Sequence, residues 1–168
     1  MLTFIKNLFS PQKPNAALAW QLAGNNAGSA YWLYAAPVHL VLQRDSFSLA
    51  APVPLLLESN ESDVLTSALN KHFEADGLMF FWHQNTWFLS LKTNPNIQTT
   101  APQSVINKDI NAFLPTGEGA MQWAKFQNEI QMFLFDHPIN LAREAKRLPV
   151  INSIWCYGLG TIENKNAN

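Results

Sequence analysis

The sequence predicts an α+β fold in a single domain, with a mainly antiparallel sheet and helices packed on one side. The apolar patterns run in the order strand block, helix, hairpin, two helices, strand, which differs from the strict alternation of a doubly wound fold. The 168 residues are 48% apolar and 14% charged, so one domain can bury most of its surface. We expect a core at 30–160, a helical arm and linker at 1–29, and a tail at 161–168.

The arm and linker are predicted to contain two short helices. The opening MLTFIKNLF has amphipathic spacing, but Lys6 interrupts it and no small-residue cleavage site follows. We interpret it as a surface helix and not as a signal peptide. The stretch AALAWQLAG predicts a second helix that ends at Gly24, before a polar linker.

Residues 30–50 are rich in aromatic and branched side chains, which predicts two or three antiparallel strands. The polar residues 43–46 predict a tight turn, and Pro37 predicts another break. A helix is expected at 59–73 because apolar residues recur there with helical spacing, before the stop at Asp76-Gly77. Its predicted apolar face consists of Val64, Leu65, Ala68, Leu69 and Phe73.

The second half of the chain predicts a hairpin, two helices and a strand. Residues 78–93 hold two aromatic runs separated by polar residues, which is typical of a hairpin. A polar loop at 93–107 follows. Prolines then separate a long helix at 118–135, a shorter one at 138–147 and a final strand at 150–157.

The long helix carries two apolar stripes at about 100° per residue. The first consists of Trp123, Phe126, Ile130, Phe133 and Leu134. The second consists of Met121, Met132, Phe135 and the polar Asn128. A helix that is apolar over this much of its surface is expected to be central, so we predict that the Asn128 amide is buried and hydrogen-bonded.

Six residues near the end of the chain form the candidate ligand-binding site. They are Asn128, His137, Asn140, Arg143, Asn152 and Trp155. Asn140 and Arg143 are three residues apart on a helix and therefore project to one side. If the last strand returns beneath the two helices, the guanidinium, amides and imidazole would form an anion cradle.

A structural network is the alternative for the same residues. In that arrangement they pair with one another and with the backbone, and they clamp the helix corner to the sheet. His137 would then cap the helix that begins beside Pro138. Both readings stay open at the level of sequence.

Other polar residues give weaker signals. His39 on a predicted strand is either a ligand or, more simply, a hydrogen-bonded core or turn histidine, and His72 and His83 suit the surface. The segment PTGEG suits an anion at a helix start or a plain helix start capped by Thr116. Cys156 lies between aromatic residues and is expected to be a buried apolar side chain.

Composition excludes several classes of function. The net charge is -1 and the 11 Lys and Arg residues are scattered, so we expect no nucleic-acid partner. One cysteine permits no intramolecular disulfide and no thiolate metal site. No apolar run approaches the roughly 18 residues of a membrane span, so a cytoplasmic protein is expected.

Motifs of known chemistry are absent from the sequence. It contains no glycine-rich phosphate loop, no nucleophile elbow, no HExxH and no dense set of Asp and His. We therefore predict no catalytic residues, no metal and no cofactor.

The C-terminal third combines NEIQM, HPIN, Arg143 and NSIW with a following GLG. This combination resembles a family of bacterial proteins, some of them labelled regulatory proteins of the Rpf cluster type, and APVHLVLQRDSFSL is similar to a second block of that family. The family's Trp-x-Trp-Gly ending appears here as Trp155-Cys156-Tyr157-Gly158, so the second ring differs.

A more remote similarity links the same region to the close of the domain inserted into archaeal-type cofactor-independent phosphoglycerate mutases. The residues concerned are His137, Asn140, Arg143, Asn152, Trp155, Gly158 and Gly160. No segment matches the metal-dependent core of those mutases. The resemblance therefore implies an accessory domain without a catalytic centre.

We hypothesise a non-catalytic cytoplasmic protein that acts by protein–protein interaction or regulation, as a homo-oligomer or with another protein as partner. The alternative is a binder or enzyme for a small phosphorylated or carboxylated metabolite, with Arg143 as the anion-binding residue. A third reading is a stand-alone relative of the inserted domain that keeps the fold and binds no ligand.

Overall fold

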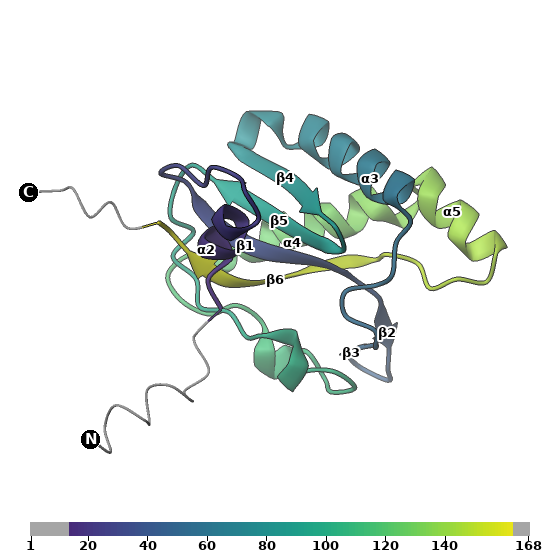
Figure 1. The fold of residues 1–168 in the computed structure, drawn as a ribbon. Helices are drawn as coiled ribbons and strands as arrows, with labels where there is room; N and C mark the ends of the chain where they lie inside the picture. The colour runs from purple at the N-terminus through teal and green to yellow at the C-terminus, as the bar shows by residue number, and fades with distance from the viewer. Residues whose placement is uncertain (1–13, 163–168) are drawn as a thin grey trace, which may run out of the picture.

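The computed structural model describes residues 14–162, which form an α+β domain around a four-stranded antiparallel sheet (Figure 1). The order of strands across the sheet is β4 (Leu78–His83), β5 (Thr86–Leu91), β1 (Tyr31–Val38), β6 (Ser153–Gly160). The predicted fold class is confirmed. The helix expected within residues 1–9 and the tail from 163 onward lie outside the described residues.

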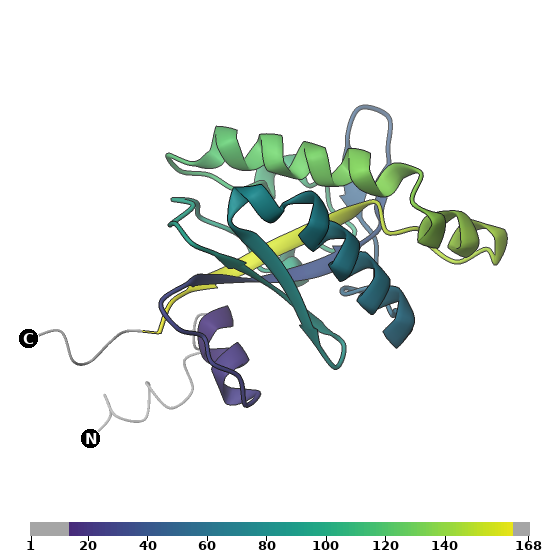
Figure 2. The ribbon, with the colours of Figure 1, turned by 90° about the horizontal axis from the view of Figure 1, so that it is seen from above.

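The two longest helices cover one face of the sheet, as predicted (Figure 2). They are α3 (Ser59–His72) and α4 (Ala120–Phe135). The shorter α5 (Pro138–Ala145) extends past one end of the sheet, and α2 (Ala16–Leu22) packs on the opposite face. The helix predicted from AALAWQLAG is therefore present, and it covers the face that α3 and α4 leave open.

Short elements complete the second face. The hairpin of β2 (Leu40–Leu42) and β3 (Phe47–Leu49) forms a separate sheet, with the predicted turn at 43–46. Single 3-10 turns occur on this face at Pro102–Ser104 and Asn111–Phe113, whereas a third, Glu74–Asp76, follows α3. Gly77 has the positive φ of 71° expected of the residue that ends the α3 segment.

The central strand β1 buries side chains on both faces. Leu33 and Ala35 are fully buried under α3 and α4, whereas Trp32 stacks on Trp20 of α2 with ring centroids 5.1 Å apart. Ala36 on that second face packs in the cluster beneath the β2–β3 hairpin. Because both faces are covered, β1 reads as a nearly continuous apolar run instead of an alternating one.

Pro37 does not break its strand, contrary to the prediction. β1 pairs with β5 only from Tyr31 to Tyr34, while its pairing with β6 continues and matches Pro37 with Ile154. The carbonyl of Pro37 accepts from the amide of Leu55 at 2.9 Å, on the side away from β6. The N–H and the C=O of one residue in an antiparallel strand lie on the same side. The N–H that proline lacks would therefore also face away from β6, so no hydrogen bond of the sheet is lost.

Two further predictions need correction. β6 begins at Ser153 instead of residue 150, because residues 149–152 serve as the connection from α5. On α3, Leu65, Leu69 and Phe73 are buried as predicted, but Val64 is exposed. The α3 face is completed by the small polar residues Ser62 and Thr66, whose hydroxyl groups are hydrogen-bonded.

The side chain of Asn70 on α3 pairs with the backbone of the edge strand β4, and Trp82 of β4 also donates to Asp63 of α3 at 2.9 Å. The Asn70 amide nitrogen donates to the Phe80 carbonyl at 2.9 Å, and its amide oxygen accepts from the Phe80 N–H at 2.6 Å. We predict that Asn70→Ala lowers the free energy of unfolding by about 1–3 kcal/mol in urea denaturation, because both backbone groups lose their partner. Asn60→Ala, at an exposed position of the same helix, is the control, and an equal loss in both variants would contradict this role.

Candidate functional site

Asn140 of the predicted site is a buried connector between α4 and β6. Its amide nitrogen donates to the carbonyls of Leu134 at 2.8 Å and Ile151 at 2.7 Å, and its oxygen accepts from the Ile151 N–H at 2.8 Å. The residue as a whole is 4% exposed. Both donors of the amide are used inside the protein, so none is left for a ligand.

Arg143 is held in the same corner and is also 4% exposed. Its Nε donates to the Pro149 carbonyl at 2.7 Å, and its Nη1 lies 3.0 Å from each carboxylate oxygen of Glu61. Glu61 also accepts from the Glu58 N–H in the capping box at the start of α3. The guanidinium thus faces a carboxylate of the protein where the anion-cradle hypothesis requires a bound anion.

Asn152 and Trp155 also have hydrogen-bond partners inside the protein. The Asn152 amide accepts from the Leu40 N–H at 2.7 Å and donates to the Leu40 carbonyl at 2.9 Å. The Trp155 indole donates to the Thr100 carbonyl at 2.8 Å. Together with the contacts of Asn140 and Arg143, these bonds favour the structural network over a ligand site.

His137 caps α5, as the structural alternative predicts. Its Nδ1 accepts from the Ile139 N–H at 3.1 Å, so this nitrogen is unprotonated. Partial burial lowers the pKa of His137 below its ordinary value, by more than the nearby Asp136 raises it.

Asn128 does not join this network, and the prediction that it is buried is wrong. It is exposed on α4, as are the other members of the second apolar stripe. Met121, Met132 and Phe135 are 76%, 77% and 85% exposed. Only the first stripe, which includes Trp123, Ile130 and Leu134, packs on the sheet.

We call the solvent-facing row on this helix the α4 outer stripe. It consists of Met121, Ala124, Asn128, Met132 and Phe135. At about 100° per residue these five positions fall within an arc of about 80°. The sequence predicted a second apolar stripe on this helix. Helical spacing alone did not distinguish a solvent-facing stripe from a buried one.

Other polar residues singled out by sequence have structural roles. His39 Nδ1 donates to the Val150 carbonyl at 2.8 Å, which supports the core or turn reading. Burial raises the pKa of the Cys156 thiol to about 12, so it is a neutral apolar group and not a nucleophile. Among residues 14–162, no group of three or more His, Cys, Asp or Glu is placed to hold a metal ion.

The segment PTGEG leads into the start of α4. The cap is Gly119 and not Thr116, which instead pairs through its backbone with Gln98. The Gly119 N–H donates to the Asn96 carbonyl at 2.9 Å, and a Cβ at Gly119 would collide with the Pro95 carbonyl oxygen. Glycine therefore allows the 95–96 loop to pack directly on the start of the helix.

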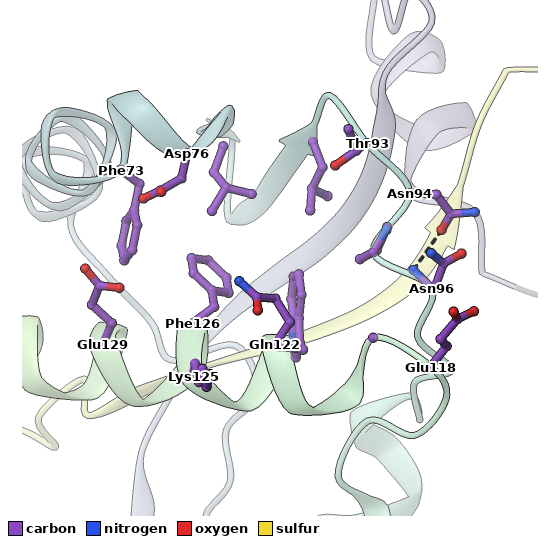
Figure 3. Close-up of a pocket in the computed structure, with 15 residues that line it drawn as sticks. Phe73, Asp76, Thr93, Asn94, Asn96, Glu118, Gln122, Lys125, Phe126 and Glu129 are labelled. Carbon is purple, nitrogen blue, oxygen red and sulfur yellow. Dashed lines mark hydrogen bonds between the residues drawn. The ribbon is translucent and has the colours of Figure 1, made fainter.

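A groove of about 480 Å³ lies between the first half of α4, the end of α3 and the loop after β5 (Figure 3). Its volume falls within the range of about 300–1,000 Å³ that is common for small-molecule sites. Apolar residues lining it are Phe73, Leu78, Leu91, Trp123 and Phe126. Polar residues lining it are Asp76, Thr93, Asn94, Asn96, Glu118, Gln122, Lys125 and Glu129.

The charges of this groove are mainly negative. Figure 3 shows Asp76 and Glu129 towards one end and Glu118 towards the other, with Lys125 between them on α4. The indole N–H of the buried Trp123 has no hydrogen-bond partner among the residues that the structure describes. Three carboxylates and one ammonium favour a cationic or neutral polar ligand over a phosphate. The lining comes from dispersed segments, so no local motif predicts it.

Comparison with protein-family models, with curated proteins and with solved structures gives no match for this chain. The resemblance to bacterial regulatory proteins and to the mutase inserted domain therefore stays a prediction. In the part of the chain that the structure describes, none of the helices combines the length and the apolar character needed to cross a bilayer.

The Arg143–Glu61 pair provides a test of the structural network. Both side chains are largely buried, with exposed fractions of 5% and 13%. Arg143→Met is expected to lower the free energy of unfolding by about 3–5 kcal/mol, because a carboxylate then lacks its partner. Glu61→Gln and the double variant complete a double-mutant cycle by urea denaturation. Additive effects of the two substitutions would show that the pair contributes no coupling.

His137 provides a pH test. Its pKa is lower in the folded protein than in the unfolded chain, so the unfolded chain takes up the proton first as pH falls. The stability contributed by neutral His137 is complete above about pH 6.5, its ordinary value, and is lost as pH falls through the folded-state value. His137→Asn keeps a capping oxygen that does not titrate. Urea denaturation at about pH 7.5 and about pH 5 should show a smaller acid-induced loss in the variant; equal losses would refute this assignment.

Proposed function

We propose that this chain is a non-catalytic protein-interaction domain that binds a protein through the α4 outer stripe. The observation that carries the proposal is the exposure of Met121, Met132 and Phe135 on one side of one helix. Apolar side chains that gather on an exposed surface commonly mark a protein-binding site. Methionine and aromatic residues are also enriched in the cores of interfaces.

The contacts in the α5 corner support a non-catalytic role. Asn140, Arg143 and Asn152 are hydrogen-bonded to the protein itself, and the thiol of Cys156 is buried and neutral. The resemblance to bacterial regulatory proteins points in the same direction.

Small-molecule binding in the groove beside Trp123 is the second candidate function. The groove has the size of a ligand site, and Trp123, which lines it, has a buried indole N–H without a partner among the described residues. The carboxylates of the groove would repel the phosphorylated or carboxylated metabolite that the sequence suggested as an alternative ligand. A ligand with an apolar body and a cationic or neutral polar end is the better fit.

Site-specific photocrosslinking tests the protein-binding proposal. We expect Met132→benzoylphenylalanine and Phe135→benzoylphenylalanine to give ultraviolet-dependent adducts with one defined protein in living cells, because these side chains would lie inside the interface. The matched controls are the same substitution at Leu22 on α2 and at Leu56 before α3, which are 79% and 73% exposed. Adducts that are equally abundant at the control positions, or absent at the α4 positions, would contradict the proposal.

A further inference from the structure

We propose that the partner on the α4 outer stripe is a second copy of this chain, and that the two α4 helices pack antiparallel about a two-fold axis at Asn128. This inference rests on the proposed function and identifies its partner. The α4 helix lies beside α3 in the layer that covers the sheet (Figure 2), and all five residues of the stripe are exposed.

The stripe is symmetric about Asn128. Met121 and Phe135 each lie seven residues from it, and Ala124 and Met132 each lie four residues from it. In an antiparallel pair centred on this residue, Met121 faces the partner's Phe135, and Ala124 faces the partner's Met132. A two-fold interface requires a surface that is complementary to itself, and this order of residues meets that requirement.

Side-chain sizes match in the same register. The small Ala124 leaves room for the long, flexible Met132 side chain of the partner subunit, and this exchange occurs on both sides of the axis. Alternation of large and small residues lets two helices approach to about 8–10 Å between their axes. At the ends of the stripe the thioether of Met121 meets the Phe135 ring of the partner subunit, which is a favourable sulfur–aromatic contact.

Asn128 is the one polar residue in the stripe. Its position at the centre of the stripe would place it beside the partner's Asn128, where the two amides can hydrogen-bond. An amide carries both a donor and an acceptor, so two copies on the axis can donate to each other reciprocally. A single asparagine in an apolar helix seam is a known means of fixing register. A purely apolar residue would permit sliding of one helix along the other.

Charges beside the stripe fit the same arrangement. Lys125 and Glu129 are exposed on the same side of the stripe, where Glu129 Oε1 also lies 3.0 Å from His72 Nε2 of α3. In the antiparallel pair, Lys125 lies about 3 Å along the axis from the partner's Glu129, since helical residues rise about 1.5 Å each. The two-fold axis repeats this opposite-charge pair, whereas a parallel pair would place each residue beside its own copy.

Single cysteines test the axis directly, because the native Cys156 is buried and gives no background. We expect Asn128→Cys to form a disulfide-linked dimer on mild oxidation of the full chain. Met121→Cys alone should stay monomeric under denaturing conditions, whereas a mixture of Met121→Cys and Phe135→Cys should cross-link. Circular dichroism of each variant verifies folding. Failure of Asn128→Cys to cross-link, or cross-linking of Leu22→Cys on α2 to the same extent, would overturn the proposed axis.

Sedimentation equilibrium measures the association itself. Wild-type protein should dimerise, and Asn128→Asp should raise the dissociation constant at least tenfold at neutral pH, because two carboxylates then meet on the axis. Gln122→Glu, an added charge outside the stripe, is the control. Wild-type protein that stays monomeric, while benzoylphenylalanine at 132 captures a different protein, would overturn the inference and leave the proposed function standing. A monomer without adducts would overturn both.

Discussion

The ion pair between Arg143 and Glu61 holds together the corner on which the rest of the arrangement depends. It joins α5 to the first turn of α3, and the neighbouring Asn140 joins the end of α4 to the start of β6. A buried ion pair adds less to net stability than its geometry suggests, because both charges lose water. Its effect here is to fix α5 against the first turn of α3. The groove lies at the opposite ends of α3 and α4, beside Phe73 of the α3 segment and the first half of α4.

Side-chain amides provide backbone-like pairing where the sheet ends. Asn70, Asn140 and Asn152 each donate to the carbonyl and accept from the N–H of one residue, respectively Phe80, Ile151 and Leu40. An amide side chain offers the same donor and acceptor as a peptide group, so it can substitute for a missing strand. The residues that looked most like a binding site in the sequence are therefore explained by the connections of α5 and β6 to the sheet.

Local sequence patterns predicted the helices and the β4–β5 hairpin well. They did not predict which distant strands and side chains would meet. The β4–β5 hairpin, α3 and the buried stripe of α4 follow from alternation and helical spacing within short segments. The pairing of β1 with β5 and β6 does not, because no local pattern records which distant strands meet. Glu61 is likewise separated from Arg143 by 82 positions and has its own local role in a capping box. For the same reason the sequence left the choice between site and scaffold open.

On the outer side of α4, the helical spacing of apolar residues does not predict burial. Two apolar stripes on one helix predict two surfaces that avoid water, but the sheet covers only the one that contains Trp123 and Ile130. Folding of the helix does not require the other stripe, since Met has a helix propensity close to that of Lys or Gln and Phe has a lower one. Exposed Met132 and Phe135 therefore gain nothing locally that a polar residue would not supply. The contact that we propose outside the domain would account for their apolar surface, and the self-complementary order around Asn128 is the feature that favours another copy of α4 as the partner.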